Sequence, residues 1–148
     1  MTATGHAVIG TVIASQVGNP IVAIPLAIAS HVAADLFPHW DTGTHRSGKT
    51  WNALFIQSFF DVVLGFVLSF IIITNFFPQT SLSYAFLIVI ASQLPDWLTA
   101  PYYFFKIQLF KPFYKFQTHF DNKLDAPWGI IWQGAFLVGI VVLFKLIS

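Results

Sequence analysis

The sequence predicts an all-α, polytopic helical membrane protein with about five hydrophobic helices in a single domain, residues 1–148. Three observations support this class. Charged residues make up 9% of the chain, whereas a typical soluble domain carries about 25%. Hydrophobic residues make up 56%, and the mean hydropathy is +0.72. The apolar residues form runs between Pro, Gly and Asn breakers, with no alternation of the kind that predicts strands.

The first two hydrophobic segments are short. Residues 6–17 end at the helix breaker Gly18-Asn19-Pro20, and residues 21–37 stop before Pro38. Each segment is shorter than the roughly 20 residues of a full membrane span. We therefore expect a short hairpin, and the sequence leaves open whether this hairpin fully crosses the bilayer.

Three further hydrophobic segments follow and are expected at residues 51–77, 82–94 and 128–147. The first of them is long enough to span with tilt, and it contains one acidic residue, Asp61. The next ends at Pro95-Asp96. An aromatic, basic stretch at residues 102–123 then separates it from the last hydrophobic segment.

If successive hydrophobic segments run in opposite directions across the membrane, most of the basic residues lie on one side. That side receives the N-terminus, the loop at residues 38–50 and the stretch at residues 95–126. It holds six of the seven Lys and Arg residues, namely Arg46, Lys49, Lys106, Lys111, Lys115 and Lys123. Because cytoplasmic loops are enriched in Lys and Arg, we predict that this face and the N-terminus are cytoplasmic.

Composition also excludes several classes of protein. The chain has no cysteine, which rules out disulfides, thiolate metal sites and cysteine nucleophiles. Its formal charge of +1 gives no support to nucleic-acid binding. The N-terminus lacks a basic region, so we expect no cleavable signal peptide.

Histidine and aspartate cluster at the end of the second hydrophobic segment. His31 and Asp35 are four residues apart, so they share one face of a helix. His39 and Asp41 follow just after Pro38, where that helix should stop. Such ligands are costly near a membrane unless they bind something, and a transition metal is the simplest candidate.

The register of the hairpin brings a further histidine to this cluster. His6 precedes Gly18 by twelve residues, and His31 follows Asn19 by twelve. The two rings should therefore meet at similar depth on neighbouring antiparallel helices. Asp61 is ten residues into the third segment, about 15 Å from its start, and should reach the floor of the cavity that this cluster forms.

Imidazole and carboxylate ligands suit zinc best, with manganese or iron as alternatives. The number of candidate ligands allows one or two ions, and paired metals suit phosphoester hydrolysis.

Each of these residues also has a structural interpretation. His31 and Asp35 can hydrogen-bond to each other on a helix surface, and Asp41 can cap an interfacial turn. Asp61 can hydrogen-bond within its own helix, although an acid inside a span is usually functional. The loop that holds Arg46 can simply be solvated or face lipid headgroups.

Four short motifs together resemble the predicted membrane-bound metal-dependent hydrolases of the LexA-regulated inner-membrane type: Thr4-Gly5-His6, Ser30-His31-x3-Asp35, Leu94-Pro95-Asp96 and Thr118-His119. The pattern His-x3-Asp-x2-Pro-His is also similar to the metal motif of zinc-dependent phospholipase C. In this chain the Pro-Asp element follows the His-x3-Asp helix, the reverse of the family's usual order. The metal ligands that this resemblance implies are His6, His31, Asp35, Asp96 and His119, and the cluster after the second segment adds His39.

The resemblance implies a multi-pass protein of the prokaryotic inner membrane, and the distribution of basic residues predicts that its site faces the cytoplasm. We predict a metal-dependent hydrolase that uses metal-activated water to cleave a phosphoester of a lipid or lipid-linked substrate. Arg46 and Lys123 would neutralise phosphate charge, and Asp61 or Asp41 would handle protons. The alternatives are a small non-enzymatic membrane subunit and a divalent-metal carrier, both using the same cluster. The sequence does not determine the oligomeric state and allows a homo-oligomer.

Overall fold

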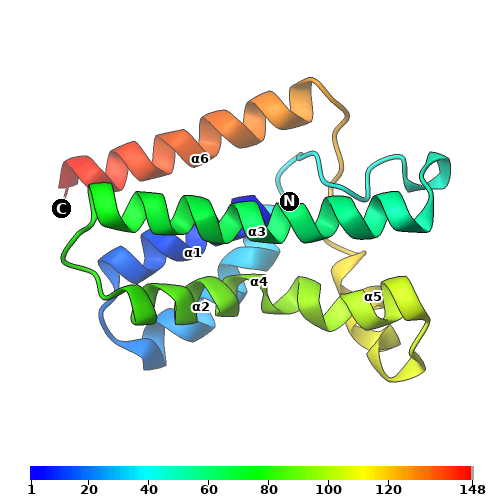
Figure 1. The fold of residues 1–148 in the computed structure, drawn as a ribbon, viewed down its shortest axis with the longest axis horizontal. Helices are drawn as coiled ribbons and strands as arrows, with labels where there is room; N and C mark the ends of the chain where they lie inside the picture. Colours follow the sequence, from blue (N-terminus) through cyan, green and yellow to red (C-terminus); the bar gives the residue numbers. More distant parts are fainter. Residues whose placement is uncertain (148) are drawn as a thin grey trace.

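The computed structural model describes residues 1–147 and is all-α over that range, which confirms the predicted fold class. Its α-helices within those residues are α1 (Ala3–Gln16), α2 (Pro20–Asp35), α3 (Trp51–Phe76), α4 (Leu82–Phe105), α5 (Lys111–Gln117) and α6 (Trp128–Ile147) (Figure 1). Two 3-10 turns, η1 (Arg46–Gly48) and η2 (Gln108–Phe110), lie in the connections. The helix beyond the five expected is α5, inside the aromatic, basic stretch.

Three helices, α3, α4 and α6, are long and apolar enough to cross a membrane. Large apolar side chains are exposed along them, for example Phe60 on α3 and Val138 on α6, which are 64% and 65% exposed. Water would penalise so much exposed apolar surface, whereas lipid would not. The chain is therefore membrane-associated.

The α1–α2 hairpin is too short to span. Helices of 14 and 16 residues reach about 21 and 24 Å at about 1.5 Å per residue, against a hydrocarbon core of about 30 Å. Asn19 caps the start of α2 by accepting a hydrogen bond from the N–H of Ile21. In Figure 1 the hairpin lies behind one half of α3 and α4, and the N-terminus lies part-way along α3. The N-terminus thus sits inside the bundle, not at its end as expected from the alternation of segments.

Helix α1 is the central helix of the bundle and packs against α2, α3, α4 and α6. Two glycines permit this close packing. A Cβ on Gly10 would come within 2.5 Å of Ser92 Oγ on α4, and one on Gly65 within 2.9 Å of the Ala7 side chain. The absence of these side chains lets α3 and α4 pack closely against α1, and α4 thereby brings Asp96 near His6.

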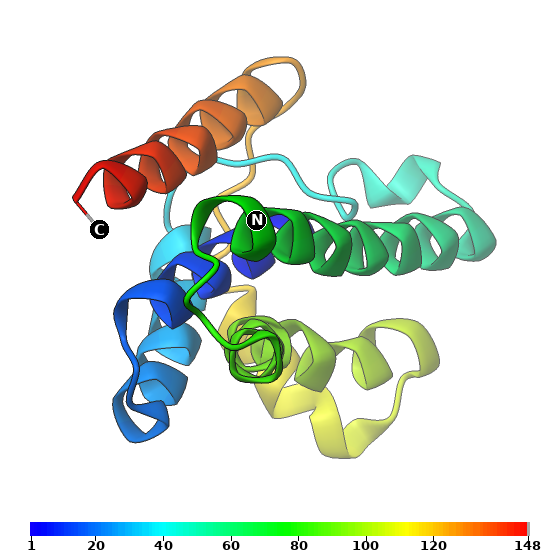
Figure 2. The ribbon, with the colours of Figure 1, turned by 60° about the vertical axis from the view of Figure 1, so that its left-hand side comes forward.

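Helix α4 continues through Pro95 and Pro101, so the expected end of this segment at Pro95 is wrong. Proline removes one backbone hydrogen bond and usually bends a helix without necessarily ending it when neighbouring helices support both halves. In Figure 2 the first turns of α4 are seen end on, whereas its later turns run across the view. The bend lies in the helix that carries Asp96.

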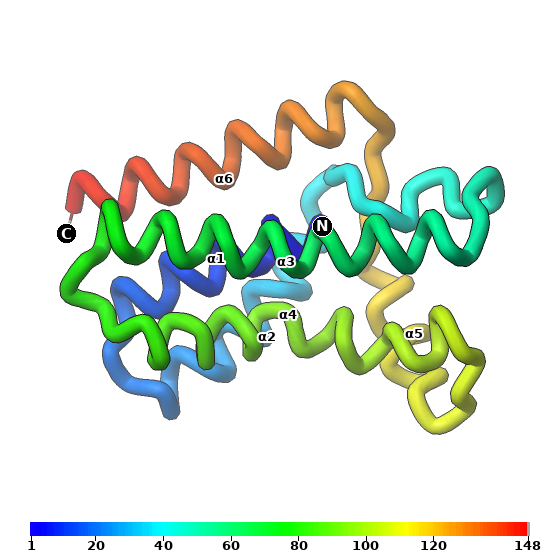
Figure 3. Tube along the Cα trace, viewed as in Figure 1, coloured from blue at the N-terminus to red at the C-terminus, as the bar shows by residue number. Residues whose placement is uncertain are grey.

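The two loops at the end of the hairpin are joined by backbone hydrogen bonds. The N–H of His39 donates to the carbonyl of Asn122, and the N–H of Leu124 donates to the carbonyl of His39. The N–H of Asn122 donates to the carbonyl of Asp35 at the end of α2. Figure 3 shows these two loop segments, residues 36–50 and 118–127, converging near the N-terminus. This pairing positions Asp121 beside His39.

Candidate metal centre

The two histidines and the aspartate of the hairpin meet Asp96 of α4 in one cluster. His6 Nε2 lies 3.2 Å from Asp35 Oδ1, and His31 Nε2 lies 3.3 Å from Asp35 Oδ2. Asp96 Oδ1 approaches His31 Nε2 to 3.6 Å. One ligand atom each from His6, His31 and Asp96 lies within 4.8 Å of the others, a spacing that could hold a metal ion. We call these three residues the first group.

His31 is held in one orientation by the backbone of α4. Its Nδ1 lies 2.8 Å from the carbonyl oxygen of Ser92. A carbonyl only accepts hydrogen bonds, so Nδ1 carries the hydrogen and, in the neutral ring, Nε2 carries the lone pair. That lone pair faces the carboxylates of Asp35 and Asp96. Acceptors that face one another in this way need a donor or a cation between them. The Gln117 amide offers one donor, 2.5 Å from Asp96 Oδ1 and 3.4 Å from His31 Nε2, and a proton on the ring or a metal ion would supply a cation.

His39 has the same arrangement one turn beyond α2. Its Nδ1 lies 2.8 Å from the carbonyl oxygen of Phe37, and its Nε2 lies 3.2 Å from Asp121 Oδ1. His39, Asp41 and Asp121 form a second group with the spacing of a metal site. Asp35 lies between the groups, since its Oδ1 is 3.2 Å from His6 and 3.9 Å from His39.

The two groups differ in how their charge is balanced. In the second group the Lys123 ammonium lies 2.9 Å from Asp41 Oδ2 and 3.2 Å from Asp121 Oδ2. Burial acts to raise the pKa of Asp121, but its contacts with His39 and Lys123 outweigh this and hold the pKa below its ordinary value. Burial acts to lower the pKa of Lys123, but Asp41 and Asp121 raise it above its ordinary value. The second group thus has an internal cation.

The first group lacks such a lysine. His6 is 1% exposed, and within residues 1–147 neither of its ring nitrogens makes a hydrogen bond, although Nε2 lies 3.2 Å from Asp35 Oδ1. A buried polar group without a partner is costly. Coordination of a metal by His6 would satisfy a nitrogen that makes no hydrogen bond in the described structure, so the first group fits a metal better than the second.

The Met1 amino group lies between the groups. It contacts the carboxylate of Asp35 and lies 2.6 Å from His39 Nε2. A positive charge at this point offsets part of the negative charge of the aspartates.

A cavity of about 330 Å³ opens beside the cluster, and the other sequence-predicted residues line it. We call it the polar cavity, because charged side chains lie in its wall. Asp41, Arg46, Asp61 and Asp96 all line it, as does Lys123.

Two of these residues are held in place by specific contacts. The Arg46 guanidinium donates to the Tyr114 hydroxyl at 3.1 Å and lies over the Tyr103 ring. Asp61 instead caps α1, because its two carboxylate oxygens accept the N–H groups of Ala3 and Thr4 at 2.7 and 3.1 Å.

The structure brings together five of the six predicted metal ligands, His6, His31, Asp35, His39 and Asp96. It does not bring His119 to them, because that side chain is exposed and packs its ring against Phe120.

Sequence reasoning missed Asp121 and Gln117. Gln117 Nε2 lies 2.5 Å from Asp96 Oδ1 and 3.4 Å from His31 Nε2. Both residues lie in the same aromatic, basic stretch as His119, which indicated that this stretch contributes to the site. The sequence did not show which of its polar side chains point toward the cluster.

Comparison with protein-family models, with curated proteins and with solved structures gave no match. The case for this site therefore depends on its geometry.

Proposed function

We propose that the protein is a membrane-bound, metal-dependent hydrolase acting on the phosphoester of a lipid or lipid-linked substrate. One observation carries the proposal. His31 and His39 each anchor Nδ1 on a backbone carbonyl and direct Nε2 at aspartate oxygens. This is the arrangement by which proteins orient histidine ligands toward a metal.

The donor set favours a borderline or hard divalent ion. Imidazole nitrogen and carboxylate oxygen suit zinc, and they also suit manganese or iron. When bound, such an ion lowers the pKa of a coordinated water and supplies a nucleophile near neutral pH. One ion fits the first group, and Asp35 lies where it could contact a second at the other group.

The chain's own residues support a phosphate beside this cluster. Arg46 and Lys123 line the polar cavity and offer positive charge to an anionic substrate. The Tyr103 hydroxyl is buried without a hydrogen-bond partner and lies in the wall of the same cavity. The Asp41 carboxylate already contacts Lys123. If a bound phosphate took over Lys123, this carboxylate would be free to accept a proton.

The proposed setting is a multi-pass protein of a prokaryotic inner membrane with the site facing the cytoplasm. One side of the molecule holds the start of α3 at Trp51, the end of α4 at Phe105 and the start of α6 at Trp128. The same side carries η1, η2 and α5 (Figure 1). Six of the seven basic residues belong to the segments of this side, which by the positive-inside tendency would be cytoplasmic.

A non-enzymatic membrane subunit remains the second candidate, and one observation favours it. The Met1 amino group and Lys123 already place positive charge among the aspartates. A cluster neutralised in this way can act as a structural polar core without any metal.

Activity in lipid nanodiscs tests the proposal. The purified protein is stripped with chelator, resupplied with zinc or manganese, and given phospholipids and prenyl phosphates while phosphate-containing products are measured. We expect metal-dependent turnover that falls at least about 100-fold in Asp96→Asn, because that substitution removes a ligand. Asp125→Asn is the matched control, since Asp125 is exposed and pairs only with His45 outside the cluster. No turnover with any substrate, or equal turnover in both variants, would overturn it.

A further inference from the structure

A second cavity, of about 210 Å³, also adjoins the cluster. It lies between α2, α4 and α5. Its walls are almost entirely apolar and include Ile28, Val32, Leu98, Phe113, Phe116 and Phe120. We call it the apolar cavity.

The apolar cavity meets the polar cavity at the candidate metal ligands. His31 and Asp35 form part of its wall. Thr99 and Gln117 line both cavities, so the two cavities adjoin at these side chains. A molecule that fills both would therefore pass directly beside Asp96, which Gln117 contacts.

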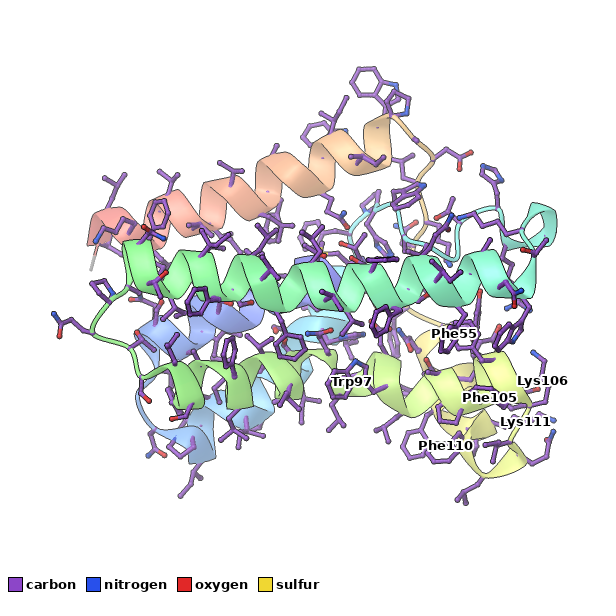
Figure 4. The ribbon with its side chains drawn as sticks, in the orientation of Figure 1. Phe55, Trp97, Phe105, Lys106, Phe110 and Lys111 are labelled. Carbon is purple, nitrogen blue, oxygen red and sulfur yellow. The ribbon has the colours of Figure 1, made fainter. Side chains whose placement is uncertain are left out.

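The apolar cavity also opens toward the surface on which lipid would lie. Phe113 and Phe116 in its wall are 46% and 60% exposed, and the nearby Leu109 on η2 is 76% exposed. Figure 4 shows Phe105, Lys106, Phe110 and Lys111 gathered around η2 and α5 at this end of the molecule. Exposed apolar residues interspersed with lysines are typical of a segment lying in the headgroup region of a bilayer.

We propose that the apolar cavity is the binding site for one hydrocarbon chain of an amphiphilic phosphoester whose phosphate occupies the polar cavity. The inference deepens the proposed function and rests on it for the nature of the headgroup. Apolar walls stabilise a chain by removing it from water, and Arg46 and Lys123 supply the charge that the phosphate needs. Together the two cavities have the volume of an ordinary small-molecule site, about 300–1,000 Å³.

Photolabelling with dodecyl phosphate that carries a diazirine at the end of its chain tests the site without requiring turnover. The full-length protein is labelled in nanodiscs, and the modified residues are located by mass spectrometry. We expect labels on α2, α4 and α5, with at least 5-fold less labelling when unlabelled dodecyl phosphate competes. Inorganic phosphate alone should compete poorly.

Filling the cavity should remove this label. In Val32→Trp we expect at least a 5-fold loss, and Leu98→Phe provides a second variant that fills the same space with a smaller change. Val138→Trp is the matched control, because Val138 is 65% exposed on α6, away from the cavity.

Three outcomes would overturn the proposal. The first is a label spread over α3 and α6 and insensitive to Val32→Trp, which would indicate general partition into lipid. The second is a label that inorganic phosphate removes as well as dodecyl phosphate does. The third is that Phe116→Cys, in a chain otherwise free of cysteine, forms disulfide-linked dimers while the label is absent, which would mean that a second copy covers the cavity. If the apolar cavity is labelled but the protein shows no turnover, the hydrocarbon-chain site would be supported and the proposed hydrolase activity would be overturned.

Discussion

The imidazole rings of His6 and His31 stack nearly parallel, with their centroids 3.6 Å apart and their planes 13° apart. Two imidazolium rings at that distance would repel each other strongly in a buried site. The pair therefore favours a state in which at least one ring is neutral. A neutral ring has a free lone pair, and this is the protonation state that a metal ligand requires.

Asp61→Asn tests the contact between Asp61 and the first two N–H groups of α1, which complements the N-cap residue Thr2. Asn keeps one acceptor but loses the charge that faces the N-terminal N–H groups of the helix. We expect the free energy of unfolding to fall by about 1 kcal/mol, measured by thermal unfolding in detergent. Asp125→Asn, at an exposed site, should change it little. Unchanged stability together with a complete loss of turnover would instead mark Asp61 as a proton carrier.

Lys123→Met tests the charge balance of the second group. The substitution leaves Asp41 and Asp121 without their ammonium partner, and we expect a loss of about 1–3 kcal/mol in the free energy of unfolding. Adding Asp41→Asn should recover part of this loss, because it removes one of the unpaired charges. Strictly additive effects in this double-mutant cycle would show that the two residues do not interact.

Acid should weaken the same contact. The pKa of Asp121 lies below its ordinary value in the folded protein, so its contribution to stability is present above the unfolded pKa of about 4 and is lost as the pH falls through the folded value. Carboxylates titrate between about pH 6 and about pH 3. Over this range, the free energy of unfolding should therefore decline less in Asp121→Asn than in the wild-type protein. An identical decline in both would contradict the assignment.

Gly10→Ala tests the close approach of α1 and α4. The added Cβ would lie 2.5 Å from Ser92 Oγ and 3.3 Å from the carbonyl oxygen of Ile88. We expect a loss of about 1–3 kcal/mol in the free energy of unfolding. Gly139→Ala is the matched control, because a Cβ there meets nothing within 4 Å and Ala favours a helix. Equal stability of the two variants would mean that the helices can separate without cost.

Hydrophobic runs and breakers predicted the five apolar helices, because helix formation in lipid is governed by length and apolarity, but they did not predict the short helix α5. The meeting of His6 and His31 also followed from the sequence, because equal spacing from a tight turn fixes relative depth. The continuation of α4 through Pro95 did not, because it depends on packing against neighbouring helices. Asp121 was missed because backbone bonds between two distant loops place it beside His39. The same loop leaves His119 outside, although its short motif made it a candidate.

Metal content is the most direct test of the central claim, that His6, His31 and Asp96 form a metal site. The protein is purified without chelator, titrated with zinc, and analysed for metal per chain after removal of unbound ions, alongside His31→Asn and His119→Asn. We expect one or two ions per chain in the wild-type protein and in His119→Asn, and loss of at least one ion in His31→Asn. No bound metal in the wild-type protein, or the same content in all three, would contradict the claim and favour a polar cluster that is neutralised by the chain's own cations.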